Sequence, residues 1–277
     1  MSLSLSLVLS RVRRIVPTFA WLLAGLLLLA ACGDGSTTSG TNADADSAKP
    51  PATGICRNLT RVEMAEPSNA GEHVACSEPH NSTTFASGEL PDDFAKADYD
   101  DPDLDTWAYG TCMSALEEYL DAGDSTLMRS LFTWVWFRPS EDAWDEGARW
   151  YRCDLLAGGD HGQHYLDLPT TTQGLLTGKA GDQWMACARG SDVNDSPRVA
   201  CNQAHGWRAV TTIKVGEAGD PWPGEKAVES KTKQFCSSSV AAWLNYPTDY
   251  NYAYTWFGKA EWKAGNRRSI CWAKTDQ

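Results

Sequence analysis

Hydrophobic and polar positions divide the chain into three regions. Residues 15–31 form an apolar run without a charge, preceded by arginines at positions 11, 13 and 14. Residues 33–53 are mostly Gly, Ser, Thr, Ala and Asp, with almost no large apolar side chain. From residue 54 onward, apolar positions recur with the periods of helices and strands. This third region is therefore expected to form the folded body of the protein.

Two stretches, 112–120 and 236–244, have the apolar period of an amphipathic helix. Each begins with a cysteine, Cys112 or Cys236, and has apolar residues four, seven and eight positions later. Positions i, i+4 and i+7 lie on one face of a helix, so each cysteine is expected to point inward. Asp103 or Asp105 is expected to cap the first of these helices.

Strand-like segments surround each predicted helix and correspond between the two halves. The aromatic stretch 132–137 matches 253–257, aligned so that Trp136 corresponds to Trp256. Each is followed by a turn of the form Trp-x-x-Gly-x-Arg, at 144–149 and 262–267, and then by a strand with a cysteine six residues after the glycine. A motif with a histidine four residues after a cysteine precedes both helices, at 76–80 and 201–205.

The same features in the same order indicate an internal repeat. The predicted fold class is α+β, with two tandem small domains, each an antiparallel sheet with one helix. The order expected in each is strand, strand, strand, helix, strand, strand. The predicted divisions are a signal peptide (1–31), a disordered tether (32–53), the first repeat (54–157), a connector that packs partly (158–181) and the second repeat (182–277).

The nine cysteines separate into one near the N-terminus and two sets of four. Because an even number of cysteines in an exported chain is typical of disulfides, the eight in the repeats are expected to pair. Four cysteines allow three connectivities, and we favour first with second and third with fourth. The first two flank a strand–turn–strand segment, and the third would join the helix to the closing strand. The favoured pairs are Cys56–Cys76, Cys112–Cys153, Cys187–Cys201 and Cys236–Cys271.

The N-terminus has the pattern of a lipoprotein signal peptide. The three arginines form a positive region, the apolar run follows, and it ends in Leu29-Ala30-Ala31-Cys32. Cys32 after Leu-Ala-Ala resembles the bacterial lipobox, in which the chain is cut before the cysteine and its thiol is acylated. The acyl chains then anchor the protein. An uncleaved transmembrane helix is the alternative, since the run is near the lower length limit for spanning a bilayer.

Composition and charge exclude several function classes. The net charge is −12 even with the three arginines of the signal peptide counted, and such an acidic chain lacks the basic footprint that binds nucleic acid. No phosphate-binding loop, no Gly-x-Ser-x-Gly elbow and no His-Glu-x-x-His motif is present, so no cofactor and no catalytic residue is predicted.

These residues together resemble the septum formation family, whose domains occur in exported or membrane-tethered actinobacterial proteins. The resemblance covers about residues 54–275. It is based on the cysteines and histidine of each repeat, on a Pro-Ser pair at 139–140 and on the Trp-x-x-Gly-x-Arg turns. The second repeat departs from the pattern: Ala204 replaces Pro79, the Pro-Ser pair is missing, and two residues are missing before Trp262. The resemblance implies an extracytoplasmic role in the envelope connected with division septa, and it implies no reaction.

Five side chains are candidates for binding: His80, His205, Trp144, Trp262 and Trp222. The histidines follow cysteines, but a Cys/His metal site would need free thiols, so no metal site is predicted and the imidazoles are expected to bond backbone groups. The strand tryptophans are expected to belong mainly to the core. A tryptophan in a proline-flanked loop, like Trp222, more often makes contacts.

The sequence therefore predicts a lipid-anchored binding or assembly module on the extracytoplasmic face of the cell membrane. Its partners would be the membrane, through the lipid, and an envelope protein or wall polymer. The alternatives are an envelope hydrolase with a cleft between the repeats, which needs polar residues with perturbed pKa values, and a carbohydrate-binding module that uses exposed tryptophans.

Overall fold

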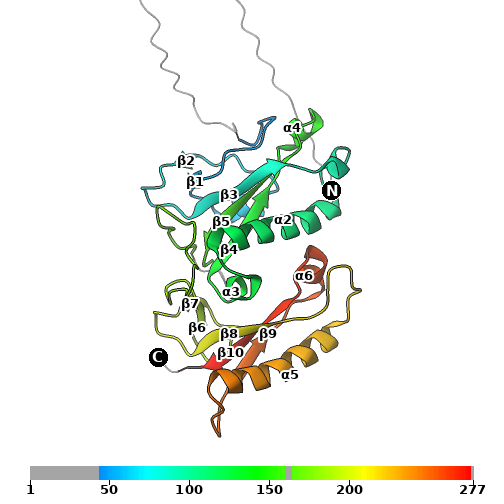
Figure 1. The fold of residues 1–277 in the computed structure, drawn as a ribbon. Helices are drawn as coiled ribbons and strands as arrows, with labels where there is room; N and C mark the ends of the chain where they lie inside the picture. The colour runs from blue at the N-terminus through cyan, green and yellow to red at the C-terminus, as the bar shows by residue number, and fades with distance from the viewer. Residues whose placement is uncertain (1–43, 160–163, 276–277) are drawn as a thin grey trace, which may run out of the picture. The chain divides into compact units, whose positions relative to one another are not determined.

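The computed structural model describes residues 44–159 and 164–275, which form two five-stranded antiparallel sheets. The predicted signal peptide and the predicted lipidation site at Cys32 lie outside these residues. In the described part of the chain, no helix is both long and apolar enough to cross a membrane. Figure 1 shows one long helix, α2 (Pro102–Leu120) or α5 (Glu225–Trp243), along one face of each sheet.

The first sheet has the strand order β2-β1-β3-β5-β4, and the second has the equivalent order β7-β6-β8-β10-β9. The first consists of β1 (Cys56–Arg57), β2 (His73–Val74), β3 (Ser82–Glu89), β4 (Phe132–Phe137) and β5 (Trp150–Ala157). The second consists of β6 (Ala186–Ala188), β7 (Arg198–Ala200), β8 (Trp207–Lys214), β9 (Tyr252–Thr255) and β10 (Arg268–Lys274). The predicted fold class and the tandem repeat are thus confirmed.

Short helices complete the repeats, and some have no counterpart. The turn helices α4 (Glu141–Asp145) and α6 (Lys259–Ala264) occupy equivalent places. The helices α1 (Arg61–Ala65), η1 (Asp92–Phe94) and α3 (Asp124–Met128) occur in the first repeat alone among the described residues.

Each long helix contacts its sheet through residues spaced four apart. The buried positions of α2 are Leu104, Ala108, Cys112, Leu116 and Leu120, and those of α5 are Val228, Thr232, Cys236 and Val240. The first helix begins earlier than predicted. Asp101, not Asp103 or Asp105, is its N-cap, because Pro102 favours the first helical position and the Asp101 carboxylate accepts from the Asp103 amide at 2.9 Å.

The four disulfides are the pairs favoured from the sequence. Cys112–Cys153 joins α2 to β5, and Cys236–Cys271 joins α5 to β10. Cys56–Cys76 and Cys187–Cys201 each join a short strand to the turn after its neighbour. Each disulfide restricts the conformations that the unfolded chain can adopt, which stabilises the folded state by about 2–4 kcal/mol.

The aromatic strands align differently from the sequence comparison. Trp136 pairs with Cys153, whereas Tyr254, not Trp256, pairs with the equivalent Cys271. A shift of two residues keeps every side chain on the same face of a strand, so the aromatic pattern fits both alignments. The structure aligns Trp136 with Tyr254. The spacing from Trp136 to Trp144 then equals that from Tyr254 to Trp262, and the apparent two-residue deletion disappears.

A bulge recurs at the same place in both sheets. The pairing of β3 with β5 skips Phe85, and the pairing of β8 with β10 skips Val210. Both side chains are buried beneath the long helix of their repeat. A bulge increases the local twist of a strand. Both sheets are therefore twisted in the same way where the long helix packs on them.

Two segments outside the predicted repeat boundaries pack onto the first repeat. The connector contributes Leu168 and Leu176 to its core, and the Leu168 amide donates to the His80 carbonyl at 2.8 Å. Residues 44–53 are also part of the fold, contrary to the prediction that the tether extends to residue 53. Ala45 is buried, its carbonyl accepts from the Ser140 amide at 2.8 Å, and the Ser47 carbonyl accepts from the Trp150 indole at 2.7 Å.

Backbone and side-chain bonds join the two repeats directly. The Leu131 amide donates to the Trp184 carbonyl and the Ala186 amide to the Arg129 carbonyl, both at 2.8 Å. On another side, the Thr106 hydroxyl donates to the Lys263 carbonyl at 3.0 Å. These contacts bring α2 and α3 of the first repeat against the second sheet and its turn helix.

Candidate functional site

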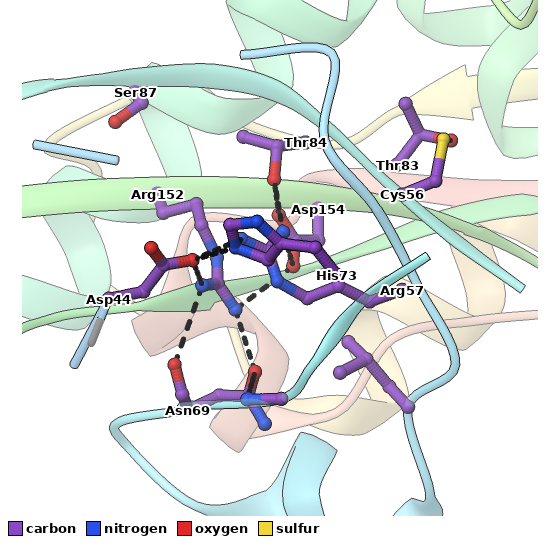
Figure 2. Close-up of polar contacts among 12 residues, drawn as sticks. Asp44, Cys56, Arg57, Asn69, His73, Thr83, Thr84, Ser87, Arg152 and Asp154 are labelled. Atoms are coloured by element: carbon purple, nitrogen blue, oxygen red, sulfur yellow. Dashed lines mark hydrogen bonds and ion pairs between the residues drawn. The ribbon is translucent and has the colours of Figure 1, made fainter. Parts of the chain in front are cut away.

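A cluster of charged side chains, most of them buried, lies against the first sheet (Figure 2). Arg152 and Asp154 flank Cys153 on β5, and because Cys153 points to the helix, its neighbours point to the other face. Both are 0% exposed, and the Arg152 Nη2 lies 3.1 Å from the Asp154 Oδ2. Arg57 from β1, also fully buried, places its Nη1 3.8 Å from the same carboxylate oxygen.

Neutral side chains complete the bonding inside this cluster. The Thr84 hydroxyl accepts from Arg57 Nη1 and donates to Asp154 Oδ1, both at 2.7 Å. The Asn69 Oδ1 accepts from Arg152 Nη2 at 3.0 Å. Without a further acid, these groups would bury two positive charges against one negative charge.

Asp44, from the segment that precedes the first repeat, supplies the second negative charge. Its Oδ2 accepts from Arg57 Nη2, lies 2.6 Å from His73 Nε2 and lies 3.7 Å from Arg152 Nη1. Burial acts to raise the pKa of Asp44, but the hydrogen bonds from His73 and Arg57 outweigh it and hold the pKa below its usual value. We call these five charged or titratable residues, Asp44, Arg57, His73, Arg152 and Asp154, the ionic cluster.

The second repeat fills the equivalent positions with apolar side chains. Ala188 follows the first cysteine as Arg57 does, and Ile270 and Trp272 flank the fourth cysteine as Arg152 and Asp154 do. Ala209, which pairs with Trp272, replaces Thr84. All four are in one apolar core cluster of that repeat.

The fold therefore does not require buried charges at this place. Buried ion pairs contribute little net stability compared with well-packed apolar groups, because both charges lose their hydration. What distinguishes the first repeat is its contact with residues 44–53. We conclude that the ionic cluster holds this segment, through Asp44, against the outer face of the first sheet.

The two predicted histidines occupy equivalent, buried positions. His80 Nδ1 lies 2.8 Å from the Glu78 carbonyl and His205 Nδ1 lies 2.7 Å from the Gln203 carbonyl, so in each ring Nδ1 is the donor. The two side chains are 1% and 6% exposed. They bond backbone groups as expected, but in both rings Nε2 has no hydrogen-bond partner among the described residues. No group of three His, Cys, Asp or Glu in the described residues is close enough to hold a metal ion.

The predicted tryptophans pack inside their own repeats. Trp144 and Trp262 are 3% and 6% exposed, and in both turns the arginine five residues later lies over the indole, at 3.9 Å for Arg149 and 3.6 Å for Arg267. Trp222 packs edge-on against Trp262, with the ring centres 5.5 Å apart. The indoles of Trp144 and Trp262 are therefore buried in the turns, whereas Trp222 is half-buried.

A concave surface with aromatic walls lies between the repeats, although no motif in the sequence marked it. This cleft has a volume of about 530 Å³, and half-buried rings from both repeats line it. The first repeat contributes Tyr109 and Trp134, the second contributes Trp256, and Tyr165 comes from the connector. We call this surface the inter-repeat cleft. Its apolar wall includes the methionines Met113 and Met128, and its polar groups include Thr133, Glu261, Asn266 and Arg268.

The inter-repeat cleft has little that resembles acid–base machinery. Neither His80 nor His205 lines it. Burial, together with the charge of Glu261, raises the pKa of Tyr109 to about 12, so its hydroxyl stays protonated at neutral pH. Arg268 pairs with Asp124 at 2.5 Å, which joins the repeats at the edge of the cleft. The arrangement is suited to apolar and aromatic contact with a bound chain.

Comparison with known families matches most of the chain. The model of the septum formation family, described as "Septum formation", matches twice, over residues 19–137 and 123–271. Searches of curated proteins and of solved structures found no match. Because the two matches together cover well over half of its residues, the chain belongs to the septum formation family.

Proposed function

We propose that this protein is a non-catalytic module, anchored by a lipid to the outer face of the cell membrane, that binds an envelope protein during cell division. Family membership supports the connection with division. The lipobox-like sequence before Cys32 supports the anchor. The observation that carries the binding role is the inter-repeat cleft, which both copies of the domain build together.

The ionic cluster limits how far the module can reach from its anchor. Since Asp44 is fixed on the first sheet, only residues 33–43 separate the folded body from Cys32. Eleven residues span at most about 40 Å when fully extended. The partner is therefore expected close to the membrane surface.

The lining of the inter-repeat cleft favours a protein segment over a glycan. Methionines and aromatic rings adapt to apolar side chains, and such residues are enriched in protein interfaces. A row of exposed tryptophans, which would favour sugar rings, is not found in the described residues, where Trp243 is the one tryptophan among the exposed large apolar side chains. An extended apolar segment with one charged residue, opposite Arg268 or Glu261, fits the cleft best.

Site-specific photo-crosslinking in living cells tests this role. A photoreactive residue at Thr133, which is exposed and lines the inter-repeat cleft, is expected to give a discrete crosslinked protein. The same residue at Ser230, on the exposed side of α5, is the control. Equal labelling at both positions, or crosslinks to glycan alone, would contradict the proposal.

The anchor has a separate test. The native protein is expected to partition into the detergent phase. Replacing Cys32 with alanine removes the thiol to be acylated, so the variant is expected to leave that phase. Metabolic labelling with a fatty-acid analogue is the matching measurement. A Cys32→Ala variant that still partitions wholly with membranes would refute lipid anchoring.

A further inference from the structure

A second pocket, distinct from the inter-repeat cleft, has a cationic lining although the protein is acidic. Its volume is about 540 Å³. Its charged residues come from three parts of the chain: Arg129 at the end of α3, Lys179 and Asp182 in or next to the connector, and Arg208 on β8. One carboxylate thus faces three cations, on a chain whose net charge is −12.

Arg129 is held in place by neutral groups. Its Nε donates to the Ser125 carbonyl at 3.1 Å, and its Nη2 lies 3.4 Å from the Thr126 hydroxyl. Within the described residues no carboxylate forms an ion pair with it. Burial and the positive charge of Arg208 lower the pKa of Arg129, which is the effect expected where cations gather without enough anions.

Two unpartnered polar atoms belong to residues that line the same pocket. His205 is 94% buried, and its Nε2 has no hydrogen-bond partner among the described residues. The Thr275 hydroxyl is also buried without a partner there. A buried polar atom without a partner costs free energy, and a bound ligand would remove that cost.

The equivalent histidine of the first repeat provides a comparison within the same chain. His80 has the same ring geometry and the same unpartnered Nε2. It is not among the residues that line this pocket, and the connector packs there, with the Leu168 amide bonded to its carbonyl. Of the two equivalent histidines, His205 alone lines this pocket.

We propose that this pocket binds a phosphate group carried by a small envelope molecule. Guanidinium groups pair with phosphate oxygens in planar, bidentate geometry, and Lys179 adds a further positive charge. The volume leaves room for a substituent of about the size of a sugar ring or glycerol. The phosphate oxygens would bond Arg129 and Arg208, and His205 and Thr275 would complete the site.

Isothermal titration of the detergent-solubilised full chain with inorganic phosphate and with glycerol phosphate tests the proposal. Arg129→Gln is expected to weaken binding about 10- to 150-fold, since a hydrogen bond to a charged group contributes about 1.5–3 kcal/mol. His205→Gln is expected to weaken it less, and His80→Gln not at all. Lys96→Gln removes one positive charge from an exposed position elsewhere and is the charge control.

Asp182→Asn separates loss of binding from loss of folding. Asp182 pairs with Arg208 at 2.5 Å on the surface, so it competes with the anion while adding little stability. Its replacement is expected to strengthen phosphate binding by up to about fivefold. Vesicles that contain phosphatidylglycerol distinguish a lipid headgroup from a soluble phosphate ester as the source. Failure of phosphate to bind, or equal effects of Arg129→Gln and Lys96→Gln, would overturn the site and leave the inter-repeat cleft untouched.

Discussion

We predict from the ionic cluster that Asp44→Asn destabilises the protein, although Asp44 precedes the first repeat in the chain. The substitution keeps the shape of the side chain but leaves Arg57 and Arg152, both 0% exposed, facing Asp154 alone. The buried charge changes from balanced to an excess of one positive charge. Removing one partner of a fully buried ion pair costs about 3–5 kcal/mol, because the other charge stays buried.

The cost at Asp44 is expected to be smaller than this limit. Its side chain is 18% exposed, so water can replace part of the lost contact. We therefore expect a loss of about 2–3 kcal/mol in the free energy of unfolding. For a folded body of this size, such a loss lowers the melting temperature by about 5–10 °C.

Calorimetry and limited proteolysis of the same samples measure the two consequences. Asp44→Asn is expected to lower the melting temperature and to expose residues 44–53 to cleavage. Asp46→Asn is the matched control, since Asp46 is exposed and bonds only the Ser140 hydroxyl, at 2.7 Å, in the described structure. Equal melting temperatures for the two variants, with the segment still protected, would refute the role given to the ionic cluster.

The pH dependence of this effect has a definite sign. The pKa of Asp44 is lowered in the folded state, so its contribution is present above the unfolded value, near 4, and is lost as the pH falls through the folded value. The native protein is therefore expected to exceed Asp44→Asn in stability at pH 7, and the two are expected to converge below about pH 4.

Two further predictions concern the contact between the repeats. Gly147 and Gly265 have positive φ in equivalent turns, so replacing either with alanine strains the backbone by about 1–2 kcal/mol. A Cβ at Gly265 would also lie 2.5 Å from the Tyr109 ring, whereas a Cβ at Gly147 would meet nothing within 4 Å. Chemical denaturation should find Gly265→Ala less stable than Gly147→Ala by about a further 1–3 kcal/mol, and equal losses would show that the two repeats do not pack here. Because the pKa of Tyr109 is raised to about 12, folding is disfavoured as the pH rises from its unfolded value, near 10, through 12. Tyr109→Phe should reduce the stability loss over that range in alkaline unfolding curves, and an unchanged curve would contradict the burial of this hydroxyl.

Local patterns were enough to predict the repeat and its framework. The spacing of the cysteines depends on short turns and on the helical period. Two cysteines lie four residues before His80 and His205, and two others lie on the buried faces of α2 and α5. Such features involve neighbours in the chain, so a single sequence displays them. The pairing of Cys112 with Cys153 was one of three possible connectivities, favoured because it joins the helix to the closing strand, and the structure confirms it.

The strand alignment shows where a local pattern stops being sufficient. Trp134, Trp136, Tyr254 and Trp256 alternate with a period of two, so a shift of two residues leaves the pattern unchanged. Only the hydrogen-bonded partners of Cys153 and Cys271 decide the register.

The sequence by itself determined two α+β copies with four cysteines each, because periodicity and cysteine spacing are local properties. Only the tertiary structure decided that residues 44–53 belong to the fold, that Asp44 meets Arg57 and Arg152, and that the copies enclose an aromatic cleft and a cationic pocket. Those groups come from positions as far apart as 44 and 152, or 129 and 275. Their proximity follows from the packing of two sheets, which no spacing in the chain encodes.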